Sequence, residues 1–150
     1  MEQFDPEAAA RVWQRVQGRQ EPGPVGEDLR PLMQAVQELA AVYRRLLGQA
    51  SGRNKDLLRR LVEGETANLA CLKGIQTLRG GQMPKGNPLP GGNEPGRKAL
   101  EKCYHRTRRL AGEYTARSAE PEFGAVFYAM AERERELCAL AAEAIGEMRR

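Results

Sequence analysis

The sequence has few of the residue types on which disulfide frameworks, zinc sites and membrane spans depend. Aromatic residues make up only 5% of the 150 residues, and there are one histidine and three cysteines. The cysteines are odd in number and lack paired metal-ligand spacing, so we interpret Cys71, Cys103 and Cys138 as reduced, mostly buried thiols. No apolar run approaches the roughly 18 residues of a membrane span.

The first residues, MEQFDP, also lack the basic region and the apolar stretch of a secretory signal. We therefore expect a cytoplasmic protein without a membrane partner. A hydrophobic content of 41% with 29% charged residues is that of an ordinary globular domain, and 150 residues favour a single core.

Charge gives little information about partners. The 24 Lys and Arg residues exceed the 20 Asp and Glu residues by only four, and the two signs are interleaved along the chain. Three arginine pairs, Arg44-Arg45, Arg59-Arg60 and Arg108-Arg109, would form a basic strip if they shared one face, which is the basis of a nucleic-acid hypothesis. We expect solvated helix faces and no nucleic-acid partner instead, because no aromatic residues accompany the arginines.

Helix-forming residues fill the segments between glycines and prolines. The pattern predicts a short helix over 6–17, with Asp5 as N-cap and Pro6 at the first helical position. A linker rich in glycine and proline follows over 18–26. Four longer helices are predicted over 27–48, 54–79, 97–118 and 121–148. We therefore divide the chain into residues 1–26, a short helix with a linker, and residues 27–150, an all-α four-helix bundle.

The connection over 80–96 differs from the two short ones. Glycine and proline occupy ten of its 17 positions, which excludes regular secondary structure. Short connections make antiparallel neighbours, so the sequence predicts two helical hairpins joined by one long crossover. Two independent hairpin domains are disfavoured, because a lone hairpin would leave much of its apolar stripe in water.

Alternating steps of three and four residues along each long helix predict the stripe that faces the bundle interior. The predicted stripes are Leu29, Leu32, Val36, Leu39, Tyr43 and Leu46; Leu58, Leu61, Glu65, Asn68, Leu72 and Ile75; Leu100, Cys103, Thr107, Leu110 and Tyr114; and Phe123, Phe127, Met130, Glu134, Leu137, Ala141, Ala144 and Met148. Glu65 and Glu134 are the two acids among them. At ~1.5 Å per residue, both lie roughly 17 to 20 Å from the hairpin loops, at one level of the bundle.

Two carboxylates buried at one level require a metal ion, a shared proton or hydrogen-bond donors from neighbours. The candidate neighbours are Asn68, Thr107, Tyr43, Tyr104 and Tyr114. The alternative is that either helix is rotated by a fraction of a turn, which would bring its glutamate to a solvated edge.

Over about residues 29 to 148 the sequence resembles the ferritin-like superfamily, and most closely the rubrerythrin-type bundles. The resemblance rests on the stretches RLVEGETAN (60–68) and MAERERELC (130–138), and on Tyr104, His105 and Tyr114. It implies a ferritin-like four-helix bundle, in which metal-binding members hold two irons with two Glu-x-x-His motifs and one further glutamate from each of the other two helices. Both motif glutamates are retained, as Glu65 and Glu134.

The other four ligand positions that the resemblance implies have lost their ligands. Asn68 and Leu137 stand at the histidine positions, and Leu39 and Thr107, beside Glu38 and Arg106, stand where the bridging acids would be. A di-iron site needs several carboxylates to neutralise and coordinate the cations. We therefore interpret the site as degenerate and expect no cofactor and no enzymatic activity. The expected role is a non-catalytic scaffold, or a subunit that associates with itself or with another protein.

The competing hypothesis is a carboxylate-bridged iron or manganese protein, and, if it is active, a non-haem oxidoreductase. In that hypothesis Glu65 and Glu134 bind the metal, and Glu38 or Glu113 turns inward as a further ligand. His105 is predicted at the surface, since it lies nearly opposite the interior stripe. Trp13 is predicted to dock the short N-terminal helix on the bundle or on a second subunit.

Overall fold

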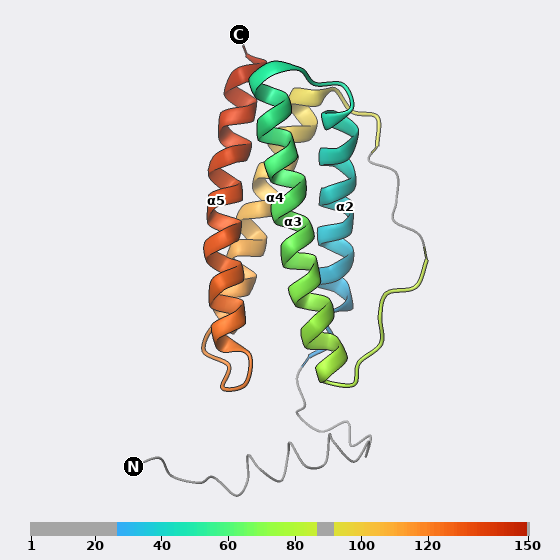
Figure 1. Cartoon of the computed structure of the whole chain (residues 1–150), viewed down its shortest axis with the longest axis vertical. Coiled ribbons are helices and arrows are strands. Elements are labelled where there is room, and N and C mark those ends of the chain that lie inside the picture. The colour runs from blue at the N-terminus through green and yellow to red at the C-terminus, as the bar shows by residue number, and fades with distance from the viewer. Residues whose placement is uncertain (1–26, 87–91, 150) are drawn as a thin grey trace, which may run out of the picture.

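The structure, a computed structural model, describes residues 27–86 and 92–149. These residues form four helices and no strand: α2 (Arg30–Leu47), α3 (Gly52–Leu78), α4 (Gly96–Arg117) and α5 (Gly124–Met148) (Figure 1). The predicted all-α fold with four long helices is thereby confirmed. The predicted helix over 6–17, with Asp5, Pro6 and Trp13, lies outside the described residues.

The four helices pack as a bundle in which each helix contacts two others. α3 packs against α2 and α5, and α4 packs against α5 and α2, so α3 and α4 lie on one diagonal of the bundle. α3 ends at the opposite end of the bundle from the point where α4 begins (Figure 1). The connection between them must therefore run the length of the bundle, whereas the other two connections are short turns.

Two helices begin three residues later than the sequence pattern predicted. At α2, Oδ1 of Asp28 accepts a 3.0 Å hydrogen bond from the backbone N–H of Arg30, so the chain turns into the helix there. At α5, the N–H of Gly124 donates to the carbonyl of Glu120 at 2.9 Å, and residues 121–123 form a turn. A Cβ at Gly124 would overlap the carbonyl oxygen of Ser118, so only glycine allows this close turn.

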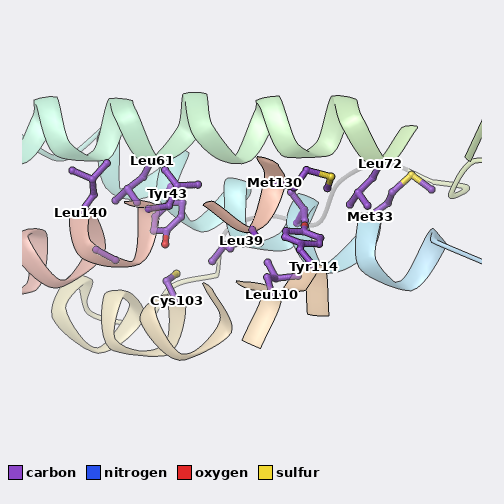
Figure 2. Packing of buried hydrophobic residues seen from close by; sticks show 14 of the residues in the cluster. Met33, Leu39, Tyr43, Leu61, Leu72, Cys103, Leu110, Tyr114, Met130 and Leu140 are labelled. Carbon is purple, nitrogen blue, oxygen red and sulfur yellow. The ribbon is translucent and has the colours of Figure 1, made fainter. Parts of the chain in front are cut away.

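The predicted interior stripes form the core. All their residues are buried except Leu32 and Met148, which pack against the core from its edge. Figure 2 shows Leu39, Tyr43 and Tyr114 among the packed side chains. Each buried Leu or Phe contributes roughly 1.5–3 kcal/mol relative to an exposed one, so the core stabilises all four helices together. Within the described residues, no helix combines the length and apolar character required to cross a bilayer.

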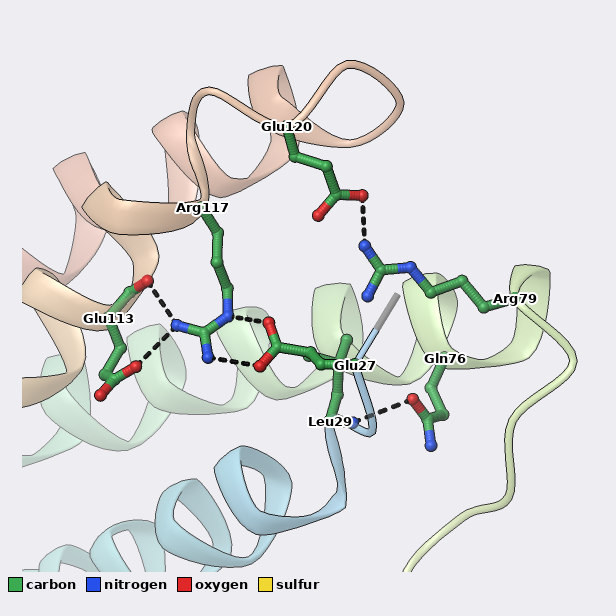
Figure 3. Close-up of polar contacts among 7 residues, drawn as sticks. All are labelled: Glu27, Leu29, Gln76, Arg79, Glu113, Arg117 and Glu120. Carbon is green, nitrogen blue, oxygen red and sulfur yellow. Dashed lines mark hydrogen bonds and ion pairs between the residues drawn. The ribbon is translucent and has the colours of Figure 1, made fainter. Parts of the chain in front are cut away.

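Polar side chains outside the predicted interior stripes connect the segments at one end of the bundle (Figure 3). Gln76 is buried; its Oε1 accepts from the backbone N–H of Leu29 at 3.2 Å and its Nε2 donates to the carbonyl of Gln82 at 2.8 Å. The Arg79 guanidinium pairs with Glu120 and lies 5.2 Å from the centroid of the Phe123 ring. These contacts join the start of α2, the end of α3 and the turn between α4 and α5.

Candidate functional site

The candidate site is a pair of carboxyl groups in the middle of the core. Glu65 of α3 and Glu134 of α5 are both 0% exposed, and each carboxyl group perturbs the pKa of the other. The predicted placement of both acids in the interior is therefore confirmed. A rotation of either helix toward a solvated edge does not occur.

Asn68 holds Glu134 in place. Its Nδ2 donates to Oε1 of Glu134 at 2.7 Å and to the carbonyl of Met130 at 3.2 Å. Its Oδ1 accepts from Nη1 of Arg133 at 2.7 Å. The amide of Asn68 therefore presents its nitrogen, not its oxygen, to the carboxyl pair, and only the oxygen could bind a metal ion.

Burial raises the pKa of Glu65 well above its ordinary value, and the neighbouring charge of Glu134 raises it further. Burial also raises the pKa of Glu134, but hydrogen bonds from Glu65 and Asn68 and the charge of Arg133 oppose that rise. If both acids were ionised, both oxygens of Glu65 and Oε2 of Glu134 would lack a donor. One proton on Glu65 supplies a donor between the two groups, so we infer that the pair shares a proton.

Two tyrosines border the pair. The Thr107 hydroxyl donates to the carbonyl of Cys103 at 2.8 Å, so the Tyr43 hydroxyl is the donor in its 3.3 Å contact with Thr107. The Tyr114 hydroxyl is buried without a partner. Burial is the main cause that raises the pKa of both tyrosines. Tyr104, the third predicted neighbour, is half-buried and lines a shallow groove between α4 and α5 instead.

Apolar side chains occupy the positions where the rubrerythrin-type resemblance places ligands. Leu39 and Leu137 are both buried, at 0% and 3% exposure. Leu137 packs so tightly on Gly64 of α3 that a Cβ there would lie 2.8 Å from its Cδ1 and closer still to its Cδ2. Thr107 is buried at the remaining bridging position, where its hydroxyl is already hydrogen-bonded.

Neither of the further acids joins the pair. Glu113 pairs with Arg117 near the end of α4, where its Oε2 lies 2.7 Å from Nη1 of Arg117 (Figure 3). Glu38 is half-buried, one residue from the fully buried Leu39. Among the described residues, no three side chains of the His, Cys, Asp and Glu type assemble into a metal-binding group. The residues present therefore do not fit a di-iron centre.

The remaining predicted residues lie away from the pair. His105 is exposed, as predicted, with its ring edge against Tyr104 at 5.5 Å between centroids. All three cysteines are free, but only Cys103 is buried. Cys71 and Cys138 are partly buried, so the prediction of mostly buried thiols is confirmed in full only for Cys103; Cys138 lines the groove beside Tyr104.

Comparison of the chain with protein-family models, with curated proteins and with solved structures gave no match. The ferritin-like relationship therefore remains a prediction that rests on the stretches 60–68 and 130–138 and on Tyr104, His105 and Tyr114.

Proposed function

We propose that this chain is a ferritin-like bundle, related to the rubrerythrin type, that has lost di-iron chemistry and acts as a non-catalytic scaffold or self-associating subunit. Two features support the ferritin-like relationship. The long connection between α3 and α4 joins opposite ends of the bundle (Figure 1). Glu65 and Glu134 occupy the motif positions on α3 and α5 and face each other.

The observation that carries the proposal is that the side chains of Asn68 and Leu137 offer the two glutamates no metal ligand. Leu137 fills its position by packing on Gly64, and Asn68 turns its oxygen toward Arg133. A di-iron centre needs carboxylates from all sides to neutralise the cations. A shared proton joins Glu65 to Glu134 without a cation, so the centre of the bundle serves stability, and any activity must come from the surface.

A second candidate function is the binding of a single iron or manganese ion. The observation in its favour is that both oxygens of Glu65, Oε2 of Glu134 and the Tyr114 hydroxyl are buried without hydrogen-bond partners. Oxygen atoms of this kind suit a hard divalent cation. Glu38 or Glu113 would have to leave its present position to supply a further ligand.

Metal analysis of protein purified without chelator separates the two candidates. The three proteins to compare are the native chain, the variant E65Q/E134Q, and the control E63Q/E136Q, which changes two exposed acids on the same helices by the same charge. We expect no bound metal in any of the three and no change of melting temperature with chelator. Stoichiometric iron or manganese in the native chain and the control, but not in E65Q/E134Q, would establish the second candidate.

Self-association is tested separately, by sedimentation equilibrium over a range of protein concentrations. We expect the average mass to rise with concentration toward a multiple of the chain mass. A constant monomer mass would leave only a scaffold that binds another protein.

A further inference from the structure

Charge is distributed very unevenly among the helices. α4 contains seven Lys and Arg residues and two Glu residues, whereas α5 contains two Arg and five Glu residues. The small net charge of +4 for the whole chain therefore conceals one strongly basic helix.

The two acids of α4 are already paired. Glu101 lies 3.2 Å from Nε of Arg97 and 3.6 Å from Nη2 of Arg149. Glu113 pairs with Arg117, which also pairs with Glu27 from the start of the described chain (Figure 3). Among the described residues, the exposed cations of α4 that have no ion pair are Lys98, Arg106, Arg108 and Arg109.

Four of the α4 cations form a row, which we call the basic stripe: Lys98, Lys102, Arg106 and Arg109. They are spaced by four, four and three residues and are all exposed, so they share the outer face of the helix, opposite buried Cys103 and Thr107. The row extends about 17 Å along the helix at ~1.5 Å per residue. One acid lies beside the stripe: Glu94 pairs with Lys102 at 2.7 Å, and its charge also interacts with Lys98 and Arg106.

The basic stripe differs from the strip that the arginine pairs suggested. Arg59-Arg60 lies on α3, diagonally across the bundle from α4, so the three pairs do not share a face. Arg108 turns toward the α5 side of the helix and lies over the Tyr104 ring at 5.9 Å. A single helix, and not a combination of pairs, therefore carries the basic face.

We propose that the basic stripe binds the phosphate backbone of double-stranded nucleic acid without reading its bases. A straight row of exposed cations suits a line of phosphates, and arginine binds phosphate in a bidentate manner. The inference is independent of the function proposed above, because it uses no residue of the carboxyl pair. It departs from the sequence-based expectation of no nucleic-acid partner, which rested on the absence of aromatic residues beside the arginines; contacts to the phosphate backbone of a duplex do not require them.

The surface around the stripe favours duplex nucleic acid over other polyanions. A helix that binds a lipid surface needs large apolar side chains beside its cations, and a protein interface needs buried apolar anchors. The exposed large hydrophobic residues of the described chain are Leu78, Met83, Val126 and Tyr128, and none of them lies on α4. Single strands are held by stacking on exposed aromatic rings, and the stripe contains none.

The test is fluorescence anisotropy with a labelled duplex DNA of roughly 20 base pairs and the RNA duplex of the same sequence, at 50 to 200 mM salt. If four phosphates are neutralised, the slope of log K against log salt is about −3.6, which is a fall of about 150-fold over this range. We expect R106Q/R109Q to reduce the slope by about half. The control R59Q/R60Q removes the same two charges from exposed positions on α3 and should keep the slope of the native chain.

Similar affinity for DNA and RNA duplexes supports a contact with the phosphate backbone that they share. An equal loss of affinity in both variants would overturn the proposal, because only net charge would then matter. Tighter binding to the single strand, or binding to phosphatidylserine vesicles but not to duplexes, would overturn it in favour of a different polyanion. Circular dichroism of both variants verifies that these exposed substitutions leave the helices intact.

Discussion

Replacement of Glu65 by glutamine tests the shared proton directly. A glutamine side chain is nearly the same shape as a protonated glutamic acid, and its amide N–H can donate to Glu134 as the acid proton does. The variant therefore keeps the geometry of the pair but cannot ionise. Glu134 keeps its second donor, Asn68, at 2.7 Å.

The magnitude follows from proton linkage. Burial raises the pKa of Glu65 in the folded protein, so the folded chain holds a proton that the unfolded chain releases above its ordinary pKa. The free energy of unfolding of the native chain therefore falls as pH rises from the ordinary toward the raised value, by about 1.4 kcal/mol per pH unit. Each pH unit within this window corresponds to roughly 3–6 °C in melting temperature for a chain of this size.

The assay is urea unfolding at a series of pH values from 4 to 8, with the exposed Glu63→Gln variant as control. We expect E65Q to match the native chain near pH 4 and to become progressively more stable than it as pH rises. E63Q should follow the native chain throughout. The same pH slope in E65Q and the native chain, or a uniform loss of stability in E65Q at every pH, would refute the shared proton.

Three further predictions concern the surroundings of the pair. Gly64→Ala should lower the free energy of unfolding by about 1–3 kcal/mol, because the new methyl group collides with Leu137. Gly74→Ala in the same helix meets open space and should raise it by about 0.5–1 kcal/mol; urea unfolding measures both, and a loss in both variants would contradict the tight contact. Asn68→Ala should cost about 1–3 kcal/mol in the same assay, because it removes hydrogen bonds to three residues of α5, and a neutral result would mean that these residues find other partners. Burial raises the pKa of Cys103 to about 12, so a thiol reagent should label it only when the protein is unfolded. Mass spectrometry detects the label, and labelling of Cys103 in the native protein would contradict its burial.

Helical periodicity was sufficient to predict the bundle and the two acids in its core. Each interior stripe repeats in steps of three and four, so the burial of Glu65 and Glu134 follows from the leucines above and below them. Their common level follows from equal distances to the hairpin loops. Local sequence is sufficient here because helix geometry alone fixes which side chains face inward.

Contacts between residues distant in sequence could not be predicted from helical periodicity. Gln76 is buried although it lies one position off the stripe, because the start of α2 and the chain after α3 both require its amide. Arg133 is half-exposed as a residue, and the tip of its long side chain donates to Asn68. Periodicity carries no information on these two contacts, whereas the spacing of Lys98, Lys102, Arg106 and Arg109 could have been read from the predicted helix over 97–118.

The protonation state of the carboxyl pair tests the central claim most directly. Carbon-13 NMR of the glutamate side chains at pH 7, with E65Q used to assign the Glu65 signal, measures it in the native protein. We predict that the Glu65 carboxyl carbon keeps the chemical shift of a protonated acid at pH 7 and that chelator does not change it. Two fully ionised carboxylates at pH 7, with signals that shift when chelator is added, would contradict the account and indicate a metal ion in place of the proton.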